Sequence, residues 1–122
     1  MAVTISTLTL GSEWTVVADA DSDATAERNV GDGAATGYLI TIDNALNAAE
    51  AEFLCLYDAQ NPTVGTSDPD FVFRVSGAEI REFFCPEGLV FSTACSYATK
   101  TTGGTAGVTN PTANVLVTLT LQ

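Results

Sequence analysis

Hydrophobic and polar residues alternate along much of this chain, with the two-residue period of a β-strand that buries one face. The clearest case is Asn114–Leu121, where valine and leucine occupy every second position. Seven further segments have strand character: Ala2–Leu10, Trp14–Ala18, Tyr38–Asp43, Phe53–Tyr57, Phe71–Val75, Ile80–Phe84 and Leu89–Tyr97. The pattern therefore predicts about eight short strands.

Turn-forming residues separate the strands in the centre of the chain. Ser76-Gly77 predicts a turn because glycine reaches positive φ without a Cβ clash. Cys85-Pro86-Glu87-Gly88 predicts a second turn, since proline fixes φ and glycine follows two residues later. In the first strand a change of apolar phase predicts a bulge or bend near Ser6-Thr7, and Gly11-Ser12 is expected to turn the chain into the second strand.

These elements predict an all-β fold, an antiparallel β-sandwich of jelly-roll or immunoglobulin-like type, in a single domain spanning residues 1–122. Periodicity does not choose between the two sandwich types. At most one short helix is expected, over Asn44–Glu52, and this segment could equally form a wide connection. A chain of 122 residues can close one core without metal or disulfide support.

The composition is strongly acidic, with 15 acidic residues, four basic residues, no histidine and a net charge of −11. Lysine and arginine supply most of the affinity for nucleic acid, so we expect no nucleic-acid partner. An anionic membrane surface is disfavoured for the same reason, and no apolar run approaches the ~18 residues of a membrane span. The N-terminal segment alternates like a strand rather than like a signal peptide. We therefore expect synthesis in a cytoplasm.

The three cysteines fit that reducing compartment better than a secreted disulfide framework, because their number is odd. Cys55 and Cys95 fall on apolar strand faces and are expected to be small buried hydrophobic residues. Cys85, beside the proline, is the cysteine expected to contact solvent. All three are predicted to be reduced and dispensable for assembly.

An acidic run offers one candidate cation site. Asp19, Asp21 and Asp23 alternate as the first oxygen ligands of a calcium loop do. Counted from Asp19, however, the glycine at position six and the glutamate at position twelve are missing. We interpret this segment as a solvated acidic loop and predict that folding does not require calcium.

Two pairs of carboxylates, Glu79 with Glu82 and Glu50 with Glu52, could in principle flank a glycosidic bond. Glu79 and Glu82 share their strand with Arg81, so the favoured interpretation is outward charge that protects an edge strand from aggregation.

Other catalytic chemistry finds little support. The usual acyl-transfer triad needs histidine, and a Ser-Lys variant would have to use Lys100, the only lysine. We therefore expect no catalytic residue, no cofactor, no metal site and no enzymatic activity.

One stretch resembles a known group of proteins. The run Phe84–Thr93 (FCPEGLVFST) is similar to a pattern that recurs in small β-sandwich proteins of bacteriophage virions. Leu56-Tyr57-Asp58 followed by Pro62–Thr66 belongs to the same pattern, so the resemblance covers roughly Phe53 to Tyr97. It departs from the pattern at Ala94-Cys95, where glycine and an apolar residue would be expected. The pattern consists of turn and core residues and assigns no functional residue.

The resemblance implies a capsid decoration or cement protein on the outer capsid surface of the virion, with the major capsid protein as partner. It implies a homo-oligomer, with a trimer at capsid threefold positions as the expected form. An acidic protein suits the exterior because packaged DNA would repel it.

Two alternatives remain open, a carbohydrate-binding or adhesin module of a fibre and a head-completion or tail-tube protein. The adhesin needs exposed aromatic residues, for which the candidates are Trp14, Tyr38, Tyr57 and Tyr97. For Trp14 itself a half-buried core position is expected, with an interface anchor as the other possibility.

Three polar loops rich in turn residues are the expected contact regions, because a compact sandwich does not need them for its core: Asp19–Gly37, Asp58–Pro69 and Gly103–Pro111. Removing Thr25–Ala35 is accordingly expected to leave the sandwich folded. The terminal strands, Ala2–Leu10 and Asn114–Leu121, could also pair with neighbours if they lie at sheet edges.

Overall fold

The computed structural model describes residues 3–10 and 12–122. These residues form eight strands: β1 Val3–Leu10, β2 Ser12–Ser22, β3 Ala35–Asp43, β4 Glu52–Asp58, β5 Phe71–Val75, β6 Ile80–Phe91, β7 Cys95–Lys100 and β8 Val115–Leu121. Residues 44–51 form two turns rather than a helix. The described residues accordingly contain no helix with the length and apolarity to cross a membrane. Gly11 and Ala2, named in the predictions above, lie outside the described residues.

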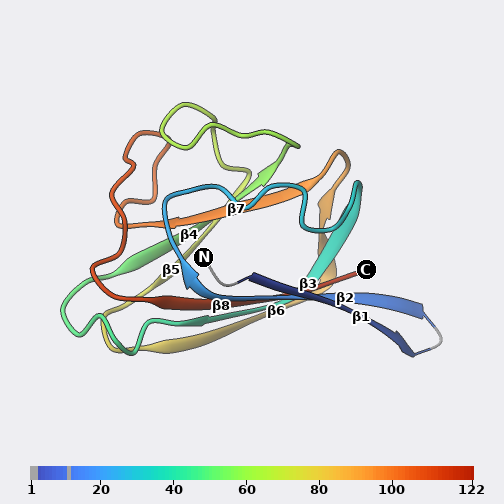
Figure 1. Cartoon of the computed structure of the whole chain (residues 1–122), viewed down its shortest axis with the longest axis horizontal. Helices are drawn as coiled ribbons and strands as arrows, with labels where there is room; N and C mark the ends of the chain where they lie inside the picture. The colour runs from blue at the N-terminus through green and yellow to red at the C-terminus, as the bar shows by residue number, and fades with distance from the viewer. Residues whose placement is uncertain (1–2, 11) are drawn as a thin grey trace.

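The strands form two antiparallel sheets that pack as two layers. One sheet has the order β1-β2-β8-β3-β6 and the other the order β5-β4-β7. Figure 1 shows the three-stranded layer above the five-stranded layer, which forms the lower boundary of the molecule. The core between them is built from alternate residues of both sheets, among them Val17, Ile40, Leu54, Tyr97 and Leu119. The predicted all-β sandwich is therefore confirmed.

The strand pairs are nested, which distinguishes between the two predicted sandwich types. β4 pairs with β5 at the centre of the chain, and β3 pairs with β6 around them. Glu27 then bridges Tyr97 of β7, and β2 pairs with β8 outermost. A long hairpin rolled up in this way is a jelly roll, and the immunoglobulin arrangement does not give this order.

The predicted turn at Cys85–Gly88 is wrong. β6 continues through it, and these residues form a bulge where the register with β3 shifts between Gly37 and Leu39. Proline and glycine suit a bulge as well as a turn. A bulge leaves residues unpaired in the ladder, where the missing N–H of proline costs no hydrogen bond, and glycine allows the positive φ of 82° at position 88. In Figure 1, β3 and β6 bend towards the upper layer at this end of the sheet. The chain turns only afterwards, at Ser92–Ala94, and enters the other sheet as β7.

The segment between β2 and β3 was predicted to be a solvated loop, and the structure corrects this prediction. Its backbone runs along β7, with hydrogen bonds from Val30 N to Cys95 O (2.9 Å) and from Thr99 N to Asp23 O (2.8 Å). Val30 is buried in the main core. The segment thus takes the place of a further strand beside β7 and covers that edge of the smaller sheet.

The other two predicted contact loops also serve the fold. The outer face of the three-stranded sheet carries Cys55, Tyr57 and Ala98, which are all buried. Ala59 and Val64 of the loop after β4 pack on this cluster, and Figure 1 shows both loops on that side of the molecule. A sheet whose two faces are apolar needs a cover on both, so these loops complete a second, smaller core.

Lys100 organises the loop between β7 and β8. Its side chain is fully buried, and its Nζ lies 2.7 to 3.3 Å from the carbonyl oxygens of residues 104–107. An ammonium group has no acceptor and needs such oxygens when water is excluded. The hydroxyl of Thr105 in turn donates to Asp68, which joins this loop to the loop after β4.

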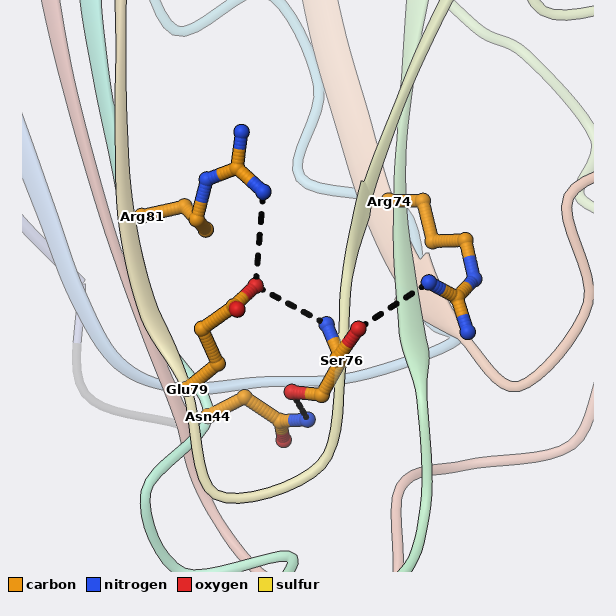
Figure 2. Close-up of polar contacts among 5 residues, drawn as sticks. All are labelled: Asn44, Arg74, Ser76, Glu79 and Arg81. Carbon is orange, nitrogen blue, oxygen red and sulfur yellow. Dashed lines mark hydrogen bonds and ion pairs between the residues drawn. The ribbon is translucent and has the colours of Figure 1, made fainter.

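Polar contacts hold the turn between β5 and β6 (Figure 2). Glu79 Oε1 accepts hydrogen bonds from Ser76 N (3.3 Å) and Arg81 Nη1 (3.5 Å), and Asn44 Nδ2 donates to Ser76 O (3.1 Å). The predicted reason for Gly77 is wrong, because positive φ occurs at Ala78 instead. Gly77 is needed for space, since a Cβ there would lie 2.7 Å from Ala48 O.

Candidate functional site

The outer side of the five-stranded sheet is a broad apolar surface. Because side chains alternate across a strand, the register places these residues on the side away from the core: Thr4, Ser6, Trp14, Val16, Ala18, Thr36, Tyr38, Leu39, Thr41, Asp43, Ile80, Glu82, Phe84, Val90, Leu116, Thr118 and Thr120. We call this surface the sheet face. One row of it, from Ser6 through Val16, Thr120 and Leu39 to Phe84, crosses all five strands.

Large hydrophobic side chains are exposed on the sheet face. Phe84 is 71% exposed and Val90 62% exposed, and Ile80 and Leu116 also face solvent. Single exposed hydrophobic residues are common on protein surfaces, but a contiguous group of them marks an interaction site. The exposed residues here belong to β6 and β8, and the partly exposed Tyr38 and Leu39 of β3 lie on the strand between these two.

The sheet face also differs from the rest of the molecule in charge. Of the side chains that the structure describes on it, only Asp43 and Glu82 are charged, and they lie diagonally opposite each other on β3 and β6. The chain as a whole has a net charge of −11. Its acidic residues are therefore concentrated elsewhere, and the sheet face is left nearly neutral. Depletion of charge at the centre is typical of protein–protein interfaces.

Trp14 lies on the sheet face and not in the core. Val17, in the opposite phase of the same strand, points into the core. Trp14 instead packs edge-on against Tyr38, with ring centroids 5.4 Å apart and planes at 67°. The predicted core position is therefore wrong. Of the four aromatic candidates for sugar stacking, Tyr57 and Tyr97 are buried, and the two that meet do not form a flat platform.

The three aspartates of the acidic run do not form a common site. Asp19 belongs to β2 and is buried, where its Oδ2 accepts a hydrogen bond of 2.9 Å from the Tyr97 hydroxyl. Burial raises the pKa of the Asp19 carboxyl and that of the Tyr97 hydroxyl. Asp23 Oδ1 instead accepts from Thr25 N at 2.8 Å. Within residues 3–10 and 12–122 there is no group of three or more acidic, cysteine or histidine residues that could hold a metal ion.

The carboxylate pairs are tied to the fold. Glu79 holds the β5–β6 turn and Glu82 is exposed on the sheet face, at the edge strand where protective charge was predicted. Glu50 accepts two hydrogen bonds from Thr112, at 2.9 and 3.0 Å. Glu52 is fully buried at the start of β4, and no donor reaches either of its oxygens. Glu50 lines a surface hollow of about 300 Å³, but Glu52 is not among the lining residues.

Burial raises the pKa of Glu52 to about 8, and the adjacent Glu50 contributes to this shift. Glu52 therefore keeps its proton in the folded chain over a pH range in which the unfolded chain, with an ordinary pKa near 4.5, has lost it. Stability from this group should fall as pH rises from about 4.5 to about 8, with a slope of up to about 1.4 kcal/mol per pH unit. Glu52→Gln should remove this slope, because glutamine stays neutral.

Urea unfolding of both proteins at pH 5, 6.5 and 8 measures this difference. The stability of Glu52→Gln relative to the natural chain should increase with pH. An unchanged difference across the range would mean that Glu52 is ionised in the folded protein.

The positions of the remaining candidates agree with structural roles. Cys55 and Cys95 are buried and Cys85 is partly exposed, as predicted, and all three are free thiols. Burial raises the pKa of the Cys95 thiol to about 12, which makes a reactive thiolate unfavourable. The Nζ of Lys100 is held by backbone carbonyls and not by a serine hydroxyl, so the Ser-Lys arrangement is not formed.

The two segments of the pattern described in the sequence, Leu56–Asp58 and Phe84–Thr93, are joined by hydrogen bonds to Asp58. The Asp58 carboxylate accepts hydrogen bonds from Ser92 N (3.1 Å), Thr93 N (2.8 Å) and Ala94 N (3.2 Å), and also from the Ser92 hydroxyl. These bonds, that from Thr93 above all, lower the pKa of Asp58. The pattern thus describes how β4 holds the turn that leads into β7. It concerns the fold and does not form a binding site.

Sequence reasoning did not identify the sheet face. The signal was present in β6, whose apolar residues occur in both phases of the two-residue period, so that this strand has apolar residues on both faces. Compared with protein-family models, with curated proteins and with solved structures, the chain matches none.

Proposed function

We propose that this protein is a non-enzymatic structural protein of a bacteriophage virion, a capsid decoration or cement protein that binds the major capsid protein through its sheet face. The observation that carries this proposal is the nearly neutral apolar sheet face of a chain with a charge of −11. The resemblance of Phe84–Thr93 to small virion proteins supplies the phage context.

The size of the sheet face supports a stable protein contact. Five strands at a spacing of about 4.8 Å, with about seven residues of 3.3 Å each, give an area on the order of 550 Å². A standard interface buries about 800 Å² of accessible surface on each partner. The lower limit for a specific interface is about 500 Å² on each partner, so the sheet face has the size of a small specific interface.

The chemistry of the surface indicates what the partner offers. An apolar centre around Phe84, Val90 and Leu116 would pack against apolar side chains, and Asp43 with Glu82 would favour a lysine or arginine at that corner. The rest of the surface, strongly acidic, would face away from the shell, where it is not exposed to packaged DNA.

The carbohydrate-binding alternative is less well supported, because the Trp14–Tyr38 pair meets edge-on. A head-completion or tail-tube protein would use the same sheet face against a different neighbour, so the location of the protein in the particle separates that alternative from a decoration protein.

Binding to capsids that lack this protein tests the proposal. The double variant Phe84→Glu, Val90→Glu places two charges at the centre of the sheet face, and we expect it to bind at least about 100-fold more weakly than the natural chain. The matched control is Val108→Glu, on the loop over the smaller sheet, where the side chain is also 62% exposed. The control should bind normally. Circular dichroism checks that each variant is folded, and equal binding by all three proteins would exclude the sheet face as the contact.

A further inference from the structure

The two sheets have four edges, and three of them are protected. The edge of β7 is covered by the segment that includes Glu27 and Val30. β5 has only five residues and carries Arg74. β6 contains the bulge with Pro86, which removes an amide donor and twists the edge away. Natural sheets use these devices to prevent pairing with other chains.

The fourth edge, β1, has none of these protections. Its sequence, VTISTLTL, contains no charged residue and no proline. It pairs with β2 without a register shift from Val3 opposite Asp19 to Leu10 opposite Ser12, so the bulge predicted near Ser6-Thr7 is wrong. On its other side β1 has no partner strand among the described residues. The strand is therefore long, regular and open to pairing.

The layer above β1 is open as well. Ile5 points to the core side of the sheet, as its register with Val17 requires, yet it is 53% exposed. The three-stranded sheet therefore does not extend over the middle of β1. A second strand beside β1 would pack against the exposed side chain of Ile5.

We propose that β1 pairs antiparallel with β1 of a second copy of this chain, so that two five-stranded sheets join into one. A second copy is favoured because β1 carries no charged residue. Two chains, each with a net charge of −11, can therefore meet at this strand without like charges in the contact. Pairing of β1 with β6 of another copy is disfavoured by the proline bulge in β6. A contact made only by β1 with itself is isologous and gives a dimer.

The geometry of this dimer has a consequence for the sheet face. Two antiparallel strands related by a two-fold axis have that axis perpendicular to the sheet, so both outer faces lie on the same side. The two sheet faces would become one continuous ten-stranded surface. This inference goes beyond the proposed function and does not depend on it, since it can be tested without any capsid.

The contact is small, because a strand of eight residues is only about 26 Å long. Interfaces well below the standard size are weak, and we expect a dissociation constant on the order of 100 µM. Copies held side by side on a surface would meet at a far higher effective concentration than in solution.

Sedimentation equilibrium from about 10 µM to about 1 mM tests the inference. The mass of the natural chain should rise from 12.7 kDa towards twice that value. Ile5→Lys should weaken association at least about 10-fold, because a charge on an edge strand opposes pairing. The matched control Val108→Lys makes the same change of charge at an exposed loop position and should associate like the natural chain. Ser6→Lys, at an exposed position of the same strand, repeats the test if Ile5→Lys is unstable.

A third variant, Phe84→Lys, separates edge pairing from contact between sheet faces. Its association should be unchanged. A natural chain that stays monomeric up to about 1 mM, Ile5→Lys that dimerises normally, or Phe84→Lys that loses association would each overturn the inference.

Discussion

Removal of residues 25–35 is expected to unfold the protein. The deletion eliminates the paired backbone hydrogen bonds between Glu27 and Tyr97, at 2.8 and 2.9 Å, and the bond from Val30 to Cys95. It also removes Val30 and Ala35 from the main core and opens the edge of β7. We expect a loss above about 5 kcal/mol, comparable to the whole stability of a domain of this size. Loss of the folded circular dichroism spectrum and of amide protection would show it.

Point variants in the same segment provide a matched comparison. Val30→Ser empties a buried site and introduces a hydroxyl group, and should cost about 2–3 kcal/mol. Thr25→Ser, at an exposed position of the segment, should change stability by less than about 0.5 kcal/mol. A folded, cooperatively melting deletion protein, or equal effects of the two point variants, would contradict the structural role of this segment.

Lys100→Met is expected to destabilise the fold by about 3 kcal/mol. Methionine keeps the apolar stem of the side chain, but it leaves the four carbonyl oxygens of residues 104–107 without their donor. Lys100→Arg should not restore stability, because a planar guanidinium group cannot replace a compact ammonium among four converging oxygens.

Thermal unfolding measures this effect, which should appear as a fall in Tm of about 10 °C for Lys100→Met. Arg74→Met removes one positive charge from an exposed position, where the guanidinium donates to the Ser76 hydroxyl, and serves as the control for net charge. If Lys100→Met were as stable as Arg74→Met, the carbonyl cage would not contribute to the fold.

The two-residue period predicted strands most clearly where one phase is continuously apolar, as in β5 and β8. It could not tell which phase of a strand faces the core when both are apolar. In β2, Trp14 and Val16 form the more apolar phase, yet Val17 and Asp19 point inward. Asp19 is tolerated there because the Tyr97 hydroxyl, from a residue 78 positions away in sequence, donates to it.

The prediction that the three polar loops are not needed for the core was wrong for a related reason. Their polar and glycine-rich composition is typical of mobile surface segments. Their order comes from contacts distant in sequence or from backbone groups, such as the carbonyl oxygens around Lys100 and the pairing of Glu27 with Tyr97. Neither kind of contact has a local sequence signal. With all three loops assigned to the fold, the sheet face is the broad surface of the described residues to which we assign the proposed contact.

Electron microscopy of the intact particle tests the proposed function most directly. We predict that density for this sandwich lies on the outer capsid surface, with Phe84, Val90 and Leu116 of the sheet face turned towards the major capsid protein. A protein that is absent from the shell, or that sits on it with the sheet face exposed to solvent, would contradict the proposal.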